Sequence, residues 1–215
     1  TPSGATMRLF NADGSRAEVS GNGVRALGAL LGMRAPDGPL QLTIQTEGGL
    51  KQLSRLERDG NRQLFRAGMG MPTGLLRVRV AAAGEDVDAV VLNMGNPQLI
   101  ILGELPDDAR FNRLGAALEH HELFPEGTNV EFVHVESPGR LRIRIWERGC
   151  GPTSSSGTGS CASLVAAAAF GGAARDAEVI APGGSQRVEW TTEGVYLTGW
   201  AEVLGEGTWL RTLPR

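Results

Sequence analysis

Two short segments of one pattern, Ser-Gly-Xaa-Gly followed by an apolar run, constrain the fold of this chain more than any other feature. The first is Ser20–Gly23, which leads into VRALGALLG, and the second is Ser156–Gly159, which leads into an alanine-rich run that ends at Phe170. Serine is a preferred helix N-cap, and glycine allows the backbone to approach a ligand closely. Each segment therefore predicts the beginning of a packed helix whose free N–H groups suit a carboxylate or a phosphate.

The sequence around these two segments also repeats. A Gly-Gly pair at 48–49 lies 28 residues after Ser20, and another at 183–184 lies 27 residues after Ser156. Each pair precedes a strand-like hairpin. A repeat of such a long period indicates an internal duplication, although Ser-Gly-Xaa-Gly is also a common way to begin a helix. We therefore expect two similar halves, each built around one helix.

Composition limits the classes of partner. The chain has 215 residues, of which 41% are hydrophobic, and a net charge of −3 with interspersed signs. This composition suits one large domain or two smaller ones and gives no indication of nucleic-acid binding. No apolar run is long enough to span a bilayer, and no signal peptide is visible. We expect a cytoplasmic protein without a membrane partner, and the two cysteines have neither a disulfide framework nor a zinc-site spacing.

Alternation of apolar and polar residues predicts strands between the two segments. The expected elements are a helix at about 23–32, a second helix at 107–121, and strands at 40–44, 76–80, 88–94, 130–135, 141–146 and 178–181. His120, His121 and His134 fall at a helix end or within a strand, where a structural or solvated role is more common than ligand binding.

The Pro-Thr-Gly sequence at 72–74 predicts the boundary between the halves. We expect an N-terminal half-domain at 1–71 and a C-terminal domain at 72–206. A last strand at 207–213 is expected to pair back to the first half, so that residues 207–215 complete it.

The strand before the second segment ends at Glu147 and Arg148. Two half-sites with a serine at each helix N-terminus suggest a ligand held between the halves. One use of such a site is two-base stereoinversion, in which an acid and a base on opposite faces move a proton across an α-carbon. The helix N-termini would hold the ligand's carboxylate and steady the charge that develops there, and Glu147 or a backbone carbonyl would accept from the ammonium.

Five motifs of the chain, NADGSRAEVSGNGVRAL, GNPQ, FPEGTNVEFV, WERGCGPTSSSGTG and LTGWA, resemble those of the diaminopimelate epimerases. The resemblance covers essentially the whole chain. It implies an α+β fold of two pseudo-symmetric domains, each a barrel-like sheet around a central helix, and cofactor-independent interconversion of LL- and meso-diaminopimelate for lysine and peptidoglycan synthesis. It implies catalytic positions at Ser20 and Ser156, and substrate contacts at Asn11, Gly21, Asn22, Asn96, Asn129, Glu147, Arg148, Gly157 and Thr158.

Four positions depart from the family pattern. The two catalytic thiols of the family fall on Ser20 and Ser156, and a serine hydroxyl is far more basic than a thiol, so its alkoxide needs a neighbouring base. Gln98 stands in the place of a histidine, and Pro152 in the place of a glutamate. The chain also begins about 19 residues before Ser20, whereas family members carry several dozen, so we expect either an incomplete fragment or a first domain that is truncated relative to the family.

Two functions stay open at this point. One is an epimerase impaired by the serines, and the other is a non-catalytic amino-acid-binding homologue. Both predict a small zwitterionic amino acid as the ligand and no cofactor or metal, and neither fixes the exact amino acid or excludes a homodimer. We expect Cys150 and Cys161 to be small packed residues rather than replacements for the thiols. A serine hydrolase and a P-loop are disfavoured, because the Gly-Xaa-Ser-Xaa-Gly elbow and the Gly-Xaa4-Gly-Lys-Ser/Thr motif are missing from the sequence.

Overall fold

The computed structural model describes residues 4–10, 14, 16–17 and 20–208. Within them lie three helices, α1 (Gly21–Gly32), α2 (Asp108–Glu119) and α3 (Gly157–Phe170). The strands are β1 (Gly4–Thr6), β2 (Leu9–Phe10), β3 (Arg16–Ala17), β4 (Leu40–Thr46), β5 (Gly49–Asp59), β6 (Arg62–Gly70), β7 (Thr73–Ala82), β8 (Glu85–Asn93), β9 (Pro97–Leu102), β10 (Asn129–Ser137), β11 (Arg140–Glu147), β12 (Gly151–Thr153), β13 (Asp176–Ala181), β14 (Gly184–Thr191) and β15 (Gly194–Glu202).

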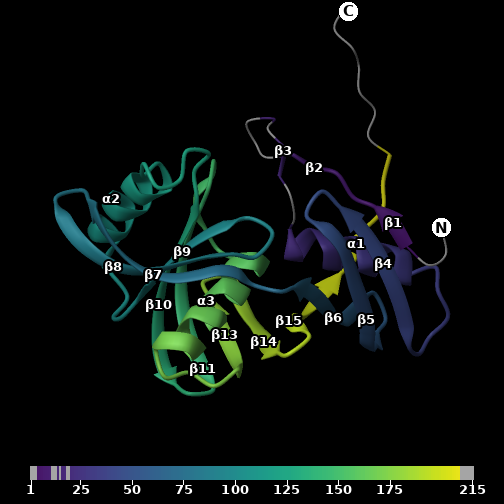
Figure 1. The fold of residues 1–215 in the computed structure, drawn as a ribbon. Coiled ribbons are helices and arrows are strands. Elements are labelled where there is room, and N and C mark those ends of the chain that lie inside the picture. The colour runs from purple at the N-terminus through teal and green to yellow at the C-terminus, as the bar shows by residue number, and fades with distance from the viewer. Residues whose placement is uncertain (1–3, 11–13, 15, 18–19, 209–215) are drawn as a thin grey trace, which may run out of the picture.

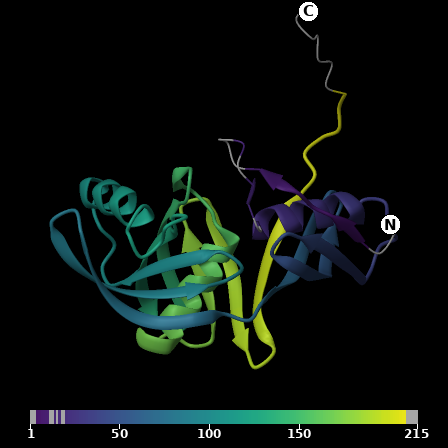
Figure 2. The same cartoon turned by 45° about the horizontal axis from the view of Figure 1, so that its top comes forward.

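One sheet of 13 strands runs through both halves of the chain. Its order is β1-β4-β5-β6-β15-β14-β13-β11-β10-β9-β8-β7, with β12 paired to β11 and with β2 and β3 forming a separate pair. Strand β15 lies between β6 and β14 and is antiparallel to both. Figure 1 shows β15 in yellow between the first half on the right and the second half on the left, and the turned view in Figure 2 keeps this order.

The α+β class expected from the sequence is confirmed, since strands and helices share one chain and each half packs strands against a helix. The strands form a continuous sheet because β15 supplies hydrogen-bond partners to both halves. In the register, Trp200 of β15 pairs with Leu64 of β6, while Leu197 pairs with Val188 of β14.

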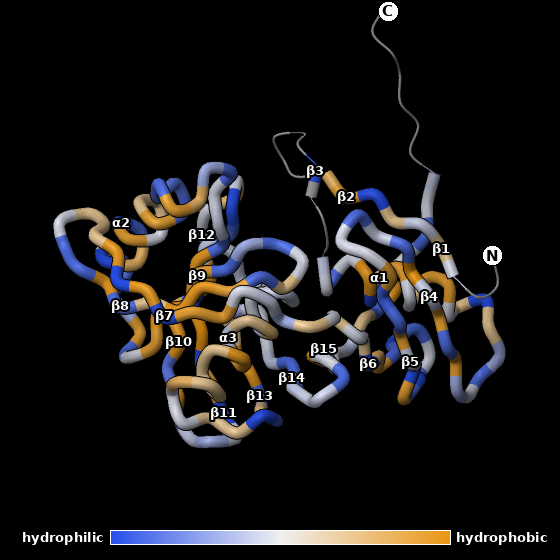
Figure 3. Tube along the Cα trace, in the orientation of Figure 1, coloured by the Kyte–Doolittle hydropathy of each residue, from blue (hydrophilic) through white to orange (hydrophobic). Residues whose placement is uncertain are grey.

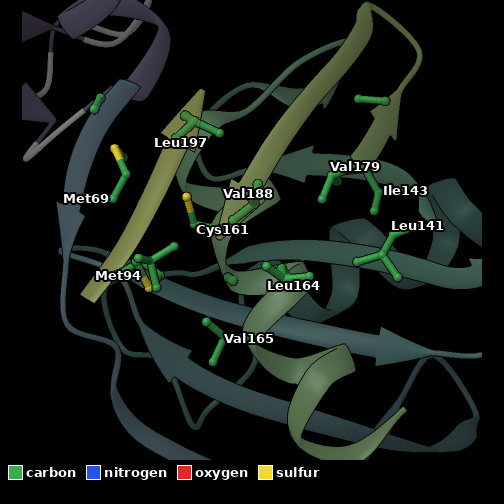
Figure 4. Packing of buried hydrophobic residues seen from close by; sticks show 14 of the residues in the cluster. Met69, Met94, Leu141, Ile143, Cys161, Leu164, Val165, Val179, Val188 and Leu197 are labelled. Atoms are coloured by element: carbon green, nitrogen blue, oxygen red, sulfur yellow. The ribbon is translucent and has the colours of Figure 1, made fainter. Parts of the chain in front are cut away.

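Helix α3 is the core of the second half. Every residue from Gly157 to Ala167 is buried, which fits a helix that is apolar or small on all faces. Figure 4 shows Leu164 and Val165 of this helix among Leu141 and Val179 of the surrounding strands. Figure 3 shows hydrophobic residues along β9 and β10, and both strands contact the helix.

Helix α1 is covered on one side, by β4, β5, β6 and β15. Val24 and Ala29 are fully buried on that side, whereas Leu30 is 42% exposed. The helix begins at Gly21, two residues before the expected start, because Ser20 already has the extended backbone of an N-cap.

Three other expectations concern the ends and boundaries of elements. The helix predicted at 107–121 is observed as α2, shorter by one residue at the start and two at the end, which is ordinary fraying. The strand predicted at 207–213 is not found in its described part, since Gly207 and Thr208 have no regular structure, and glycine disfavours strands. Its remaining residues, from 209, lie outside the described residues. The division at residues 71 and 72, and the completion of the first half by 207–215, stay predictions.

Among the described residues, no helix combines the length and the hydrophobicity that crossing a membrane requires.

Candidate functional site

The two Ser-Gly-Xaa-Gly segments adopt the same local structure. Ser20 has φ −132° and ψ 117°, and its Oγ accepts a hydrogen bond from the Gly23 N–H at 3.0 Å. Ser156 has φ −134° and ψ 126°, and its Oγ accepts from the Gly159 N–H at 3.2 Å. Both serines are therefore N-caps, and each helix begins at the next residue.

The N-termini of α1 and α3 meet at two glycines. A Cβ atom added to Gly157 would lie 2.8 Å from the Gly21 Cα, and one added to Gly21 would lie 3.0 Å from the Gly157 Cα. A side chain at either position would push the helices apart, so the close approach depends on glycine. The free N–H groups and the positive dipole ends of both helices are thereby brought to one place.

A cavity of about 160 Å³ opens beside this contact. Both predicted catalytic serines and eight of the nine predicted substrate contacts line it. The ninth, Asn11, lies outside the described residues, so its place stays a prediction. The predicted residues that line the cavity are Ser20, Gly21, Asn22, Asn96, Asn129, Glu147, Arg148, Ser156, Gly157 and Thr158.

Three further lining residues were missed by sequence reasoning, namely Leu9, Cys150 and Ser155. The prediction that Cys150 is packed is wrong, because Cys150 is exposed and follows Gly149, whose φ of 76° turns the chain after the Arg148 position. Its place directly after the Glu-Arg pair was the available signal. Cys161 is fully buried as predicted, and burial raises the pKa of its thiol to about 12.

The side chain of Asn22 connects the two half-sites. Its Nδ2 donates to the Ser155 Oγ at 3.1 Å, while its Oδ1 accepts from Arg25 Nη2 at 2.7 Å and from Gln186 Nε2 at 3.2 Å. Arg25 is only 4% exposed, and burial lowers the pKa of its guanidinium. Because the amide of Asn22 is engaged in this way, its backbone N–H in the first helical turn is the group that it leaves for a ligand.

A chain of hydrogen bonds leads from the cavity to a buried acid. Thr158 Oγ1 accepts from Asn96 Nδ2 at 3.3 Å, and Asn96 Oδ1 accepts from Gln98 Nε2 at 2.7 Å. The Gln98 Oε1 faces both carboxyl oxygens of Glu131 at 3.1 Å. Gln98 and Glu131 have no exposed surface. Gln98 is thus a buried link in this series of hydrogen bonds rather than a residue that faces the cavity.

The protonation state of Glu131 decides whether the Gln98 Oε1 has a hydrogen-bond donor. Burial and, secondarily, the charge of Glu147 raise the pKa of Glu131 well above its usual range. A protonated carboxyl donates through one of its two oxygens to the Gln98 Oε1, so hydrogen bonds then run without a break from Thr158 to Glu131. The opposite amide orientation would suit an ionised Glu131, but it would place the Gln98 oxygen 2.7 Å from the Asn96 Oδ1. The burial of Glu131, which raises its pKa, favours the protonated form.

The chemistry available at the cavity is that of a zwitterion site. Two helix N-termini suit a carboxylate, while Glu147 and Arg148 offer one charge of each sign. Histidine does not contribute to the described lining, and Pro152 lies in β12, opposite Trp146. Among the described residues, groups of three or more His, Cys, Asp or Glu that could hold a metal ion are not found.

Comparison with known proteins gives a consistent result. The family model described as diaminopimelate epimerase matches residues 90–204. A diaminopimelate epimerase from Desulforudis audaxviator is 40% identical over 95% of this chain and 79% of its own length. The corresponding protein of Parabacteroides distasonis is 38% identical over 94% of this chain and 76% of its own.

Solved structures share the fold at lower identity. A probable proline racemase from Agrobacterium radiobacter has a TM-score of 0.69 and 18% identity, over 94% of this chain and 72% of its own. A hydroxyproline epimerase from Agrobacterium vitis with bound trans-4-hydroxy-L-proline has a TM-score of 0.70 and 17% identity, over 92% and 69% of the two chains.

Proposed function

The chain belongs to the diaminopimelate epimerase family, which is a family of isomerases, and from this premise we propose that its cavity binds the amino-acid centre of a small zwitterionic substrate. The observation that carries the proposal is the meeting of two capped helix N-termini at Gly21 and Gly157. Both helix ends favour a carboxylate, and Glu147 accepts from the ammonium. Diaminopimelate is the substrate that family membership suggests.

The proposed reaction is inversion at the α-carbon. A group on one face removes the α-proton, and the electron pair of the C–H bond delocalises into the carboxylate, where the helix N–H groups stabilise the added charge. A group on the other face then returns a proton to the carbon. Ser20 and Ser156, one at each helix N-terminus, are the residues that we assign to the two faces.

Serine makes this transfer slow. A hydroxyl is a weak acid and becomes an effective base only when a neighbour takes its proton. Within the described residues, the hydrogen bonds to the Ser20 and Ser156 Oγ atoms come from the backbone N–H groups of Gly23 and Gly159. Those donors stabilise an alkoxide but cannot accept a proton.

The same contacts favour a second candidate, a non-catalytic homologue that binds an amino acid. In that case the serines serve only as helix caps, and Gln98 serves only to connect Glu131 to Asn96. Binding of the zwitterion is common to both candidates, so exchange of the α-proton is the property that separates them.

The decisive experiment follows the α-proton NMR signal of LL-diaminopimelate incubated with the purified protein in D2O. For a slow epimerase we expect gradual loss of that signal with growth of the meso isomer. The double variant Ser20→Cys/Ser156→Cys should accelerate the loss by about 100-fold or more, the range of a positioned acid–base pair.

The remaining outcomes are distinct. Binding without exchange in both the wild type and the double cysteine variant would favour the binding homologue. Loss of wild-type exchange in Cys150→Ser would assign the proton transfer to the exposed thiol of Cys150 in place of the serines. An absence of both binding and exchange would refute the proposal for this substrate.

A further inference from the structure

The carboxylate of Glu119, the last residue of α2, contacts the turn that carries the charged residues of the cavity. Its side chain is 8% exposed. Oε2 accepts from the Trp146 Nε1–H at 2.6 Å, and Oε1 accepts from the Gly149 N–H at 2.7 Å. These two donors lie on either side of Glu147 and Arg148 in the sequence. One carboxylate therefore spans the turn from which both charged side chains reach the cavity.

Two effects make a carboxylate unfavourable at this position, so its presence indicates a role beyond packing. Burial withdraws its charge from water. The C-terminal end of a helix carries a partial negative charge, which disfavours an anion. Glutamine has the same shape and avoids both effects, but its side chain has one acceptor oxygen, whereas two N–H donors face Glu119. A residue that breaks local preferences in this way is typical of a functional position.

The backbone of Glu119 connects the same helix end to the other wall of the cavity. Its carbonyl oxygen accepts from the Thr128 N–H at 3.0 Å. The next residue, Asn129, lines the cavity and accepts at its Oδ1 from the Arg148 N–H at 3.1 Å. The segment at 128–129 and the turn at 147–150 are thus both held by one residue.

Helix α2 itself is seated closely on this turn. A Cβ atom added to Gly115 would lie 2.6 Å from the indole ring of Trp146, so the ring lies directly against the helix backbone. The ring also stacks edge-on against Phe111, with centroids 5.9 Å apart. The helix therefore provides a rigid base from which the Glu119 carboxylate acts.

We infer that Glu119 is a positioning residue for the cavity, which holds Glu147, Arg148 and Asn129 in the geometry that a zwitterionic ligand requires. The inference rests on the proposed function only for the identity of that ligand. Glu119 does not line the cavity, so it acts through the turn and not by touching the ligand.

The first test compares Glu119→Gln with Glu122→Gln, a matched control that changes an exposed carboxylate three residues later. Diaminopimelate is titrated into each protein, and amide and indole NMR signals are followed. We expect Glu119→Gln to weaken binding by about 10-fold or more, since small displacements of positioning groups have large effects. Its Gly149 amide and Trp146 indole signals should shift. The control should change the affinity by less than about two-fold.

A double variant separates positioning from general stability. Trp146→Phe removes the indole donor, so the amide nitrogen introduced by Glu119→Gln no longer faces an N–H group, and the amide oxygen is free to accept from Gly149. We expect Trp146→Phe/Glu119→Gln to bind diaminopimelate with an affinity within about three-fold of that of Trp146→Phe alone. The reason is that the effects of substitutions in residues that act as a unit do not add. A residue that only stabilised the fold would give additive losses of both stability and affinity.

The inference is overturned if Glu119→Gln keeps the wild-type affinity and the wild-type signals of residues 147–150, or if affinity falls only as far as the fraction of unfolded protein explains. Should the wild type bind no amino acid, the proposed function fails, and hydrogen exchange decides about Glu119. Exchange of the Gly149 amide that is about ten-fold faster in Glu119→Gln than in the control supports the positioning role, because it reports local opening. Equal exchange rates in the two variants overturn it.

Discussion

Helices α1 and α3 begin with the same cap and then differ in how far they are covered. Ser20 and Ser156 have nearly identical backbone angles and hydrogen bonds. Beyond the cap, α3 is buried throughout residues 157–167, whereas α1 leaves Leu30 42% exposed. A four-residue segment is therefore enough to begin a helix, while the number of strands around the helix decides how much of it is core.

The two caps also differ in what lies beneath them. A Cβ atom added to Gly159 would lie 2.4 Å from the Glu131 Oε1, while one added to the equivalent Gly23 would lie 3.4 Å from the Met7 Sδ. The two caps share one backbone structure, but the carboxyl group of Glu131 beneath the second cap has the thioether of Met7 as its counterpart beneath the first. The pseudo-symmetry is therefore one of backbone and not of chemistry.

The largest expected difference between the halves is in core truncation. Leu164→Ala in α3 should lower the free energy of unfolding by about 2–5 kcal/mol, since it opens a cavity around a fully buried side chain. Leu30→Ala in α1 should lower it by less than about 1 kcal/mol, because water already reaches that leucine. Urea unfolding measures both, and equal losses would contradict the difference in coverage.

The second test acts where the two helices meet. Gly157→Ala should lower the free energy of unfolding by about 1–3 kcal/mol through overpacking and should weaken ligand binding, because the new methyl group would press on Gly21. Gly139→Ala is the control, since a Cβ atom there would have no neighbour within 4 Å. A Gly157→Ala protein with wild-type stability would show that the helix ends move apart easily.

The third test compares the caps themselves. Ser20→Ala and Ser156→Ala should each lower the free energy of unfolding by about 0.5–2 kcal/mol, the usual range for a lost N-cap. The larger loss is expected at Ser156, which is 4% exposed, because water cannot replace the cap at the Gly159 N–H. Thermal and urea unfolding of the two variants measure the difference. A larger loss of stability in Ser20→Ala than in Ser156→Ala would contradict the prediction.

The last test concerns how the free energy of unfolding depends on pH. Glu131, beneath the second cap, should contribute to this dependence, whereas Met7, beneath the first cap, should not. Burial raises the pKa of Glu131 in the folded state. In the unfolded chain this carboxyl has its ordinary pKa of about 4.3. At a pH between these two pKa values, the unfolded chain has released a proton that the folded chain keeps. Stability from this group is therefore fully present below about pH 4.3 and is lost as the pH rises.

The variant Glu131→Gln removes this pH dependence. Its stability relative to the wild type should increase as the pH rises from weakly acid to neutral, as measured by urea unfolding at several pH values. Met7→Leu, which has no titrating counterpart, should show a constant difference. Parallel curves for Glu131→Gln and the wild type would mean that Glu131 is ionised in the folded protein.

Local patterns predicted the parts of the site that local physics controls. The caps at Ser20 and Ser156 follow from residue preferences, and the resemblance named the residues that line the cavity. The exposure of Cys150 depends on a positive φ at Gly149, which composition does not reveal. The roles of Glu119 and of the engaged Asn22 amide depend on contacts across 27 or more residues, for which a single sequence carries no periodic signal.

The place of β15 was likewise beyond local reasoning, and it has a consequence for the order of folding. Asn61, beside β6, donates to Glu202 of β15, which lies 141 residues later in the chain. During synthesis, β6 therefore has no partner on this edge until the second half has emerged, a delay on the order of 10 s at ordinary rates of chain elongation. Until then the first half of the nascent chain presents the unpaired edge of β6, which is a site for misassembly between nascent chains. Expression of this protein should accordingly benefit from whatever shields that edge in the interval, such as a ribosome-associated chaperone.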